Sequence, residues 1–121
     1  MKKILVLDDD ATFVATIKAA IDPKAYTVES EGDGARGLAH IAESKPDLIL
    51  LDINMPKMDG IEFLKEMNAK YGSSAIPVLV TSNVSSLDTI SDGISLGVRG
   101  YFIKSNESLQ GIVRIIDGVF K

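Results

Sequence analysis

Three aspartates, a threonine and a lysine are the residues of this chain whose types and places along the sequence suggest chemistry. Asp8 and Asp9 follow one short apolar run and Asp52 follows another, while Thr81 and Lys104 each follow a later run. Carboxylates held close together repel one another, which raises a pKa unless a cation is present. Hard divalent cations bind carboxylate, backbone carbonyl and water oxygens, so these acids predict a Mg²⁺ site.

A magnesium ion held in this way commonly completes its coordination with a phosphate oxygen. Lys104 would offer a compact positive charge to another phosphoryl oxygen, and the Thr81 hydroxyl could donate a hydrogen bond to a third. One carboxylate could then act as the nucleophile, because carboxylates form aspartyl-phosphate intermediates. Positioning and electrostatics carry most of the catalysis of phosphoryl transfer. The set therefore predicts a site that accepts a phosphoryl group.

These residues can meet only if the apolar runs before them are neighbouring strands. Four of the runs are short and continuous, as in strands buried on both faces of a parallel sheet, and a fifth is weaker. The predicted strands cover Ile4–Leu7, Tyr26–Val28, Leu48–Leu51, Val78–Val80 and Tyr101–Ile103. Apolar residues at helical spacing separate and follow these runs. The predicted helix starts are Asp10, Asp33, Asp59, Ser85, and Asn106 or Glu107.

Five repeats of strand and helix predict an α/β fold with a parallel sheet and helices on both faces. The flavodoxin-like, doubly wound (βα)5 arrangement, with a five-stranded sheet in the order 2-1-3-4-5, fits this pattern. Strands 1, 3, 4 and 5 are then adjacent, so the polar residues at their carboxyl ends would converge, where ligands of such sheets bind. The length of 121 residues suits one domain, over residues 1–121.

The composition excludes several other kinds of site. The chain has no cysteine and one histidine, so thiolate and multi-histidine metal sites are absent. A net charge of -4 without a basic run argues against binding of nucleic acid. No apolar stretch approaches the roughly 18 residues that span a bilayer. The start of the chain carries no targeting pattern, so we expect no membrane association and a cytoplasmic location.

The chain resembles the receiver domains of two-component response regulators over its whole length. The segment from Leu51 to Gly60, with the sequence LDINMPKMDG, is similar to the phosphoacceptor loop of that family, and the acidic residues 8–10 are similar to its acidic start. Thr81 falls at the position of the family's switch Thr or Ser. Tyr101 and Lys104 fall at the positions of its switch aromatic residue and its invariant lysine. Four such motifs in order are specific for this family.

Position by position, the resemblance implies that Asp52 takes the phosphoryl group. It also implies that Asp9 binds Mg²⁺ directly and Asp8 through water, and that the backbone carbonyl of Asn54 completes the metal site with Asp52.

The resemblance further implies that Thr81 and Lys104 hold the phosphoryl oxygens. Thr81 and Tyr101 would then move together and reshape the face formed by the fourth helix, the fifth strand and the fifth helix. Asn54 and Asn83 occupy positions that tune the lifetime of the phosphorylated state in family members.

Such a domain is expected to receive its phosphoryl group from the phosphohistidine of a sensor histidine kinase or a histidine phosphotransfer protein. The resemblance implies a signalling switch rather than an enzyme that turns over a substrate, and a switch that alters binding of a downstream effector. It would be a monomer or a dimer that forms on phosphorylation.

The chain departs from the family at one position, where Ser105 follows Lys104 in place of the usual proline. The family often has a cis peptide there. A cis bond before a residue other than proline costs about 3–4 kcal/mol, so we expect a trans Lys104–Ser105 bond and a differently shaped loop.

Several other residues have simple structural interpretations. Asp10 is expected to cap a helix, and Asp59-Gly60 to form a turn and a helix start. His40 is expected at the surface or its boundary. The predicted fourth helix is rich in poor helix formers between Ser85 and Ser95, so it should be marginally stable and should exchange its amides faster than the fifth helix.

Three alternatives can be weighed against a receiver. A phosphatase of the haloacid-dehalogenase type also combines Asp, Thr and Lys. Such a phosphatase, however, has its nucleophile on the first strand, so its motifs come in the reverse order to those of this chain. A flavin-binding domain of the same fold would want a phosphate-cradling loop after the first strand, where this chain has three aspartates. A receiver-like interaction module that takes no phosphoryl group is favoured only by Ser105.

Overall fold

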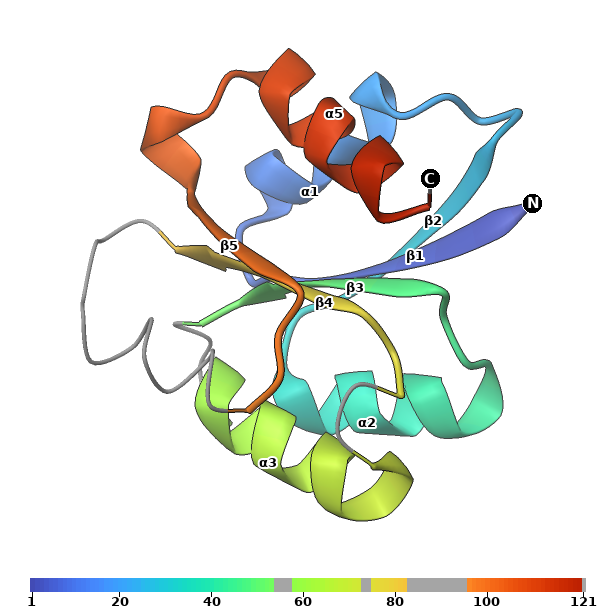
Figure 1. Cartoon of the computed structure of the whole chain (residues 1–121), viewed down its shortest axis with the longest axis vertical. Coiled ribbons are helices and arrows are strands. Elements are labelled where there is room, and N and C mark those ends of the chain that lie inside the picture. Colours follow the sequence, from blue (N-terminus) through green and yellow to red (C-terminus); the bar gives the residue numbers. More distant parts are fainter. Residues whose placement is uncertain (54–57, 73–74, 83–95, 121) are drawn as a thin grey trace.

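The computed structural model of the chain describes residues 1–53, 58–72, 75–82 and 96–120 (Figure 1). Its strands form one sheet in the order β2-β1-β3-β4-β5, and every neighbouring pair is parallel. The strands are β1 (Lys2–Leu7), β2 (Tyr26–Glu31), β3 (Leu48–Asp52), β4 (Val78–Ser82) and β5 (Gly100–Ile103). Each contains the run predicted from the sequence, and the flavodoxin-like sheet is confirmed.

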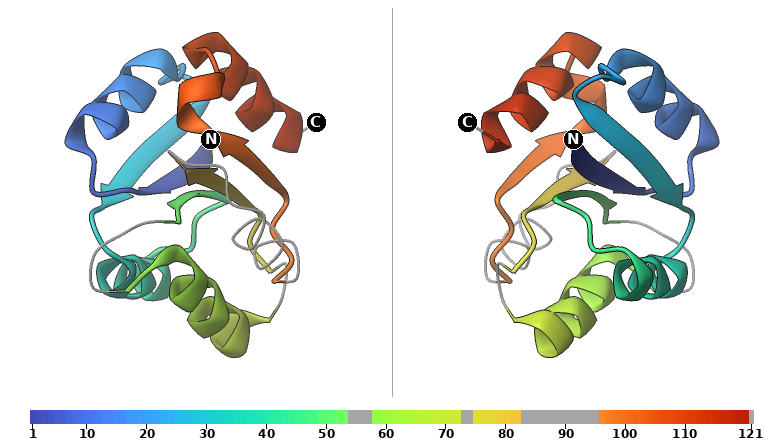
Figure 2. Two further views of the ribbon diagram at one scale, coloured as in Figure 1. Left: turned by 90° about the vertical axis from the view of Figure 1, so that its left-hand side faces the viewer. Right: turned by 90° about the vertical axis from the view of Figure 1, so that its right-hand side faces the viewer.

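Helices cover both faces of the sheet. The described ones are α1 (Ala11–Ala20), α2 (Gly34–Glu43), α3 (Gly60–Tyr71) and α5 (Leu109–Val119), with a 3₁₀ turn, η1 (Lys104–Asn106), before α5. Figures 1 and 2 show α1 and α5 on one face and α2 and α3 on the other. The predicted fourth helix lies outside the described residues. No helix in the described part of the chain is long and apolar enough to cross a membrane.

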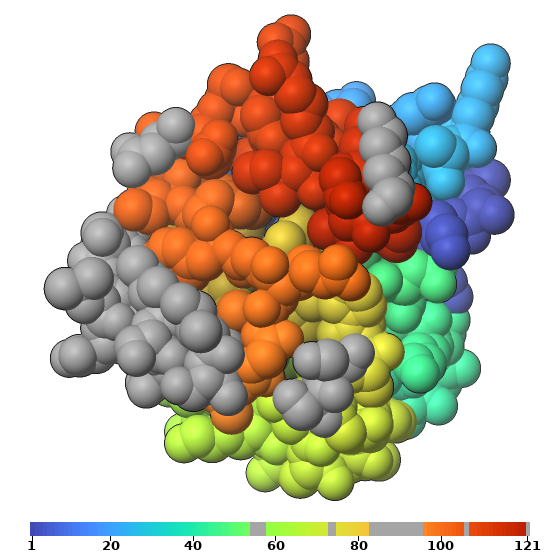
Figure 3. All heavy atoms as spheres, in the orientation of Figure 1, coloured from blue at the N-terminus to red at the C-terminus, as the bar shows by residue number. Residues whose placement is uncertain are grey.

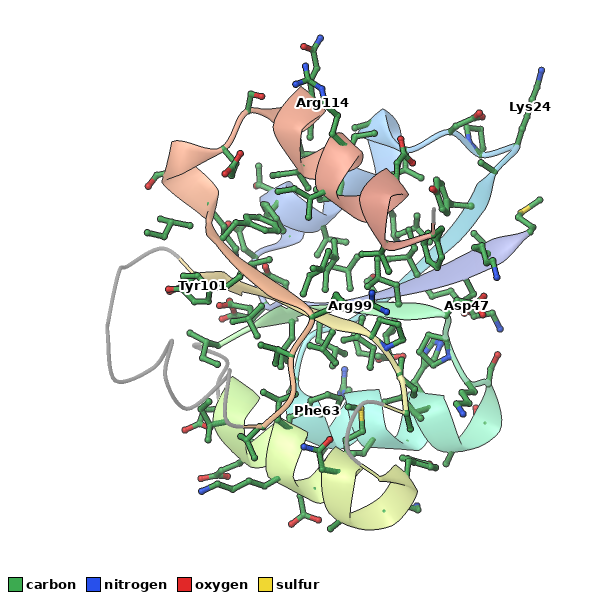
Figure 4. The ribbon with its side chains drawn as sticks, viewed as in Figure 1. Lys24, Asp47, Phe63, Arg99, Tyr101 and Arg114 are labelled. Carbon is green, nitrogen blue, oxygen red and sulfur yellow. The ribbon has the colours of Figure 1, made fainter. Side chains whose placement is uncertain are left out.

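Alternate residues of the central strands face opposite sides of the sheet. In β1, Leu5 and Leu7 pack with the core residues of α2 and α3, whereas Ile4 and Val6 pack with those of α1 and α5. Phe63 of α3 is fully buried and lies between its helix and the sheet in Figure 4. Because helices cover both faces, the central strands are continuous apolar runs in the sequence rather than alternating ones.

The described helices before α5 begin at the predicted aspartates. The Asp10 carboxylate accepts hydrogen bonds from the backbone N–H groups of Thr12 and Phe13. Asp33 and Asp59 cap α2 and α3 in the same way, each through the N–H three residues further on. These caps satisfy amide donors that the first helical turn leaves unpaired, which is why short acidic residues mark these starts.

The predicted start of the last helix was wrong by one or two residues. Ser108 is the cap of α5, and its hydroxyl oxygen accepts a hydrogen bond of 3.0 Å from the Gly111 N–H. Asn106, one of the two predicted caps, belongs to η1 instead. The chain makes this tight turn after β5 before it can enter the helix, so the helix begins later than the polar residues suggested.

The end of α5 is fastened to the edge of the sheet by an aromatic cluster. The Tyr26 hydroxyl donates a hydrogen bond of 2.6 Å to Asp117, and the rings of Tyr26 and Phe120 are 5.6 Å apart. Burial and the neighbouring carboxylate raise the pKa of Tyr26 to about 12. The Lys2 ammonium lies 5.6 Å from the centre of the Phe120 ring. The first two strands and the last helix are thereby joined.

A shallow groove of about 300 Å³ runs between β5 and α5. Figure 3 faces this side of the molecule, with atoms of β4 in yellow between the orange and red segments. Leu79 of β4, Tyr101 of β5 and Gly118 of α5 are among its lining residues. The groove leaves room for a side chain at Gly118, since a Cβ there would meet no heavy atom within 4 Å.

Gly60, the first residue of α3, has no such room. A Cβ at Gly60 would lie 2.7 Å from the Ile53 Cα and 3.0 Å from the Asp52 carbonyl oxygen. The Gly60 N–H also donates a hydrogen bond of 3.0 Å to the Ile53 carbonyl. Only glycine lets the start of α3 come this close to the end of β3.

Substitution of the two glycines by alanine should therefore have opposite effects. Gly60→Ala is expected to lower the free energy of unfolding by about 2 kcal/mol, because backbone rather than a flexible side chain must shift. Gly118→Ala, in the open groove, should raise it by up to about 1 kcal/mol through helix propensity. Urea unfolding of both variants measures the difference. A Gly60→Ala protein as stable as the Gly118→Ala protein would contradict the close approach at β3.

Candidate functional site

The predicted site residues gather at the carboxyl ends of four adjacent strands. Asp8 directly follows β1, Asp52 ends β3 and Lys104 directly follows β5. Thr81 of β4 is the register neighbour of Asp52. In Figure 1 these strand ends lie at the left of the sheet. The convergence predicted from the strand order is present in the structure.

The pleat of the sheet places Asp52 and Thr81 on one face. Leu48 and Leu50 of β3 pack toward α1 and α5, so Asp52, two residues further along, points to the same side. Leu79 of β4 packs toward α1 and α5 as well, which puts Thr81 on that side too. The site therefore opens on the face that carries the first turn of α1.

Asp8, Asp9 and Asp52 form an acidic cluster. Each offers one carboxylate oxygen, and these oxygens all lie within 4.8 Å of one another. Asp8 and Asp52 are only 4% and 5% exposed, whereas Asp9 is exposed to solvent. An all-oxygen set that is partly open to water fits Mg²⁺, which retains several waters and accepts few protein ligands. The donor chemistry therefore agrees with the predicted magnesium site.

The Asp8 carboxylate is held in place from two sides. Its Oδ1 accepts a hydrogen bond of 2.9 Å from the Asp10 N–H, and its Oδ2 accepts one of 2.5 Å from the Lys104 ammonium. Burial raises the pKa of the Asp8 carboxyl, and the hydrogen bond from Lys104 opposes this rise. A cation in the cluster would favour the charged form further.

Lys104 is a buried cation that faces two of the three acids. Its side chain is 7% exposed, and its Nζ lies 2.5 Å from Asp8 and 3.7 Å from Asp52. Such an ammonium can neutralise part of the cluster and can also bind an oxygen of a phosphoryl group on Asp52. Lys104 thus lies at the carboxyl edge of the sheet, beside the acidic cluster.

Thr81 lies on β4, the strand next to that of Asp52, and Tyr101 lies on β5, one strand further from Asp52. Thr81 is 1% exposed, and its hydroxyl donates to the Leu51 carbonyl oxygen at 3.4 Å. Tyr101 of β5 is half-buried and packs against the core on the α2 and α3 side. Figure 4 shows Tyr101 at the same side of the molecule as the carboxyl ends of the strands. Asn54 and Asn83, predicted to act at this site, lie outside the described residues.

The peptide bond after Lys104 is trans, as expected. All peptide bonds within the described residues are trans, and Lys104–Ser105 is one of them. Lys104 is the first residue of the η1 turn, and Ser105 is exposed.

Sequence reasoning missed Phe13 as a residue of the site. The Phe13 ring belongs to the first turn of α1, and its centre lies 4.3 Å from the Lys104 ammonium. Asp10 was recognised as a cap, and a residue three positions after a cap belongs to the first turn, beside the carboxyl ends of the strands. That position was the available signal.

A cleft of about 530 Å³ adjoins the acidic cluster between α1 and the end of β2. Asp8 and Asp9 are among its lining residues, and Lys18 and Arg36 contribute positive charges to its wall. The cluster is therefore accessible from the side of α1.

His40 forms a separate charged network at the edge of the sheet. Its two ring nitrogens lie 2.9 Å from Glu31 and 3.2 Å from Glu29, and the Lys3 ammonium is 3.7 Å from Glu29. The His40 side chain is 15% exposed, as expected for a boundary residue. The hydrogen bond to Glu31, helped by Glu29, raises the pKa of His40 against the opposing effect of burial.

This network predicts a pH-dependent contribution to stability. Because the folded-state pKa of His40 exceeds its unfolded value, the contribution is full below the ordinary pKa of 6.5 and is lost as the pH rises through the folded-state pKa. Relative to His40→Gln, the wild-type protein should gain about 1 kcal/mol near pH 5.5 and much less near pH 8.5. Urea unfolding across this range measures the gain. A difference that does not change with pH would show that the pKa of His40 is the same in the folded and unfolded states.

A family model described as the response regulator receiver domain matches residues 4–116. Among curated relatives, the transcriptional regulatory protein PrrA of Mycobacterium leprae is 34% identical over 113 residues, which cover 93% of this chain and 48% of PrrA. The chain thus spans about half the length of the PrrA proteins it matches.

Solved structures agree with the family model. The phosphorylated cyanobacterial phytochrome response regulator RcpA has a TM-score of 0.83 and 32% identity, with 98% of this chain and 90% of that chain covered. The Mn²⁺-bound form of the response regulator Rcp1 has a TM-score of 0.80 and 27% identity, with 98% and 91% covered. The sheet order, the residues at its carboxyl edge and these matches agree, and the chain belongs to the family of response regulator receiver domains.

Proposed function

We propose that this receiver domain accepts a phosphoryl group on Asp52 in the presence of Mg²⁺. The observation that carries the proposal is the acidic cluster, with three carboxylates within 4.8 Å and the Lys104 ammonium 2.5 Å from Asp8 and 3.7 Å from Asp52. The relatives add support, since RcpA has been solved in a phosphorylated form and Rcp1 with Mn²⁺.

In the proposed reaction a carboxylate oxygen of Asp52 attacks the phosphorus of a phosphohistidine. The new P–O bond forms as the P–N bond breaks, and the electron pair of that bond leaves with the imidazole of the donor. Asp8, Asp9 and Asp52, with the carbonyl of Asn54, would hold Mg²⁺, which supplies positive charge to the transferring oxygens. Lys104 would neutralise another oxygen, and the Thr81 hydroxyl would donate to a third.

The product is proposed to be a switch rather than a turnover intermediate. Phosphorylation would shift Thr81 and Tyr101 and so change the face that includes β5 and α5, where the groove beside Tyr101 lies. The donor would be a sensor histidine kinase or a histidine phosphotransfer protein, and the partner of the switched face an effector. For this role we propose a location in the cytoplasm.

The intact mass of the whole chain tests the proposal. Incubation with Mg²⁺ and a small acyl phosphate should add the mass of one phosphoryl group, and a chelator should prevent the gain. No gain in a folded protein that binds Mg²⁺ would favour a receiver-like interaction module instead. Continuous release of phosphate from simple phosphate esters would favour the phosphatase alternative.

A further inference from the structure

The Phe13 ring lies directly beside the cation of the proposed phosphoryl site. The Lys104 Nζ is 4.3 Å from the centre of this ring, inside the roughly 6 Å within which cation–π attraction acts. The Lys104 side chain is 7% exposed, so water screens the contact little. We propose that Phe13 is a positioning residue that holds the Lys104 ammonium at the site. The inference rests on the proposed function of that site.

Lys104 needs such a partner because the carboxylates that it contacts are also candidate ligands of the metal ion. Its ammonium lies against Asp8 and Asp52, which are also candidate ligands of a divalent cation. A metal ion on these carboxylates competes with the ammonium for the same oxygens. The face of an aromatic ring attracts the ammonium without taking part in that competition. Phe13 therefore keeps the Lys104 ammonium in place when the carboxylates of Asp8 and Asp52 bind the metal ion.

The backbone around Lys104 gives the side chain little other guidance. Its stem has four rotatable carbons, and the residue opens the short η1 turn, in which Ser105 is exposed.

Phe13, by contrast, is well anchored. Its N–H donates a hydrogen bond of 3.2 Å to the capping carboxylate of Asp10, and its side chain packs against the core between the sheet and α1 and α5. A fixed ring beside a flexible ammonium is the arrangement that positioning requires.

Three variants of the whole chain separate positioning from general packing. Phe13→Leu removes the ring but keeps an apolar side chain, and Phe13→Tyr keeps the ring. Phe120→Leu is the matched control, because Phe120 is also a half-buried ring beside a lysine, Lys2, at 5.6 Å. Phe120 packs on β2 at the end of α5 and is not part of the site.

Proton NMR of Lys104 reads the geometry directly. The ε-methylene protons of Lys104 should be shifted upfield by the ring current in the wild-type, Phe13→Tyr and Phe120→Leu proteins, and should return to ordinary values in Phe13→Leu. The rate of phosphoryl uptake from a small acyl phosphate should fall about three- to tenfold in Phe13→Leu. It should stay within about twofold of wild type in the other two variants.

The outcomes distinguish this inference from the function on which it rests. Ordinary Lys104 shifts in the wild-type protein would overturn the positioning role without any variant. An unchanged uptake rate in Phe13→Leu, or an equal fall in Phe120→Leu, would also overturn it. If no protein takes up a phosphoryl group, the proposed function fails. An upfield shift in wild type that is lost in Phe13→Leu would then still support the contact between Phe13 and Lys104. An upfield shift that persists in Phe13→Leu would refute the contact.

Discussion

An Asp52→Asn protein should take up no measurable phosphoryl group, with a rate at least on the order of 10³-fold below wild type, as for loss of a nucleophile elsewhere. The amide is a poor nucleophile and cannot form the acyl phosphate that the carboxylate forms. Asp52 is also the acid of the cluster that ends a central strand, and its register neighbour is Thr81, the proposed donor to the phosphoryl group. Intact mass after incubation with Mg²⁺ and a small acyl phosphate gives the rate.

The matched control for this loss is Asp10→Asn. Asp10 follows Asp8 and Asp9 directly in the sequence, but its carboxylate caps α1 by accepting hydrogen bonds from the N–H groups of Thr12 and Phe13. Asparagine caps helices about as well as aspartate, so this variant should fold and take up the phosphoryl group at nearly the wild-type rate. Equal uptake by Asp52→Asn and wild type would move the acceptor to another residue.

Lys104→Ala should have the largest effect on stability. In a chelating buffer near pH 7 the free energy of unfolding is expected to fall by about 3 kcal/mol. The change removes the cation that lies 2.5 Å from Asp8 and 3.7 Å from Asp52 and leaves carboxylates close together in a buried setting. The exposed Lys65 of α3 provides the control, since Lys65→Ala should change stability little.

Two conditions should rescue the Lys104→Ala protein. If Mg²⁺ binds the folded cluster as proposed, it should restore much of the lost stability by mass action, more than it adds to wild type. A lower pH should also reduce the difference in stability between Lys104→Ala and wild type. Burial already raises the pKa of Asp8, and loss of Lys104 raises it further, so protonation as the pH falls removes the unpaired charge. A loss of unfolding free energy that changes with neither Mg²⁺ nor pH would show that Lys104 stabilises the protein through packing and not through its charge.

The strands and the convergence of the site were predictable because a parallel sheet imposes them. Runs such as Ile4–Leu7 and Leu48–Leu51 are apolar at every position, since helices cover both faces. Once the strand order is known, the residue after each run must lie at the same edge. Asp8, Asp52 and Lys104 follow from this rule with no knowledge of side-chain contacts.

Contacts between elements far apart in the sequence were not predictable in this way. Phe13 and Lys104 meet because the first turn of α1 lies on the same face as the loop after β5, which strand order alone does not reveal. His40 contacts Glu29 and Glu31 because α2 packs beside β2 with one particular orientation about its helix axis. Local polarity also misplaced the start of α5, since Ser108 becomes the cap only after the chain has made the η1 turn.

Chemical trapping of the acceptor tests the central claim most directly. The protein would be incubated with Mg²⁺ and a small acyl phosphate, reduced with borohydride, which converts an aspartyl phosphate to homoserine, and digested for tandem mass spectrometry. We expect homoserine at position 52 and unmodified aspartate at positions 8 and 9, with no conversion when a chelator is present. Homoserine at another position, or a phosphorylated protein with aspartate intact at position 52, would contradict the assignment of Asp52 as the phosphoryl acceptor.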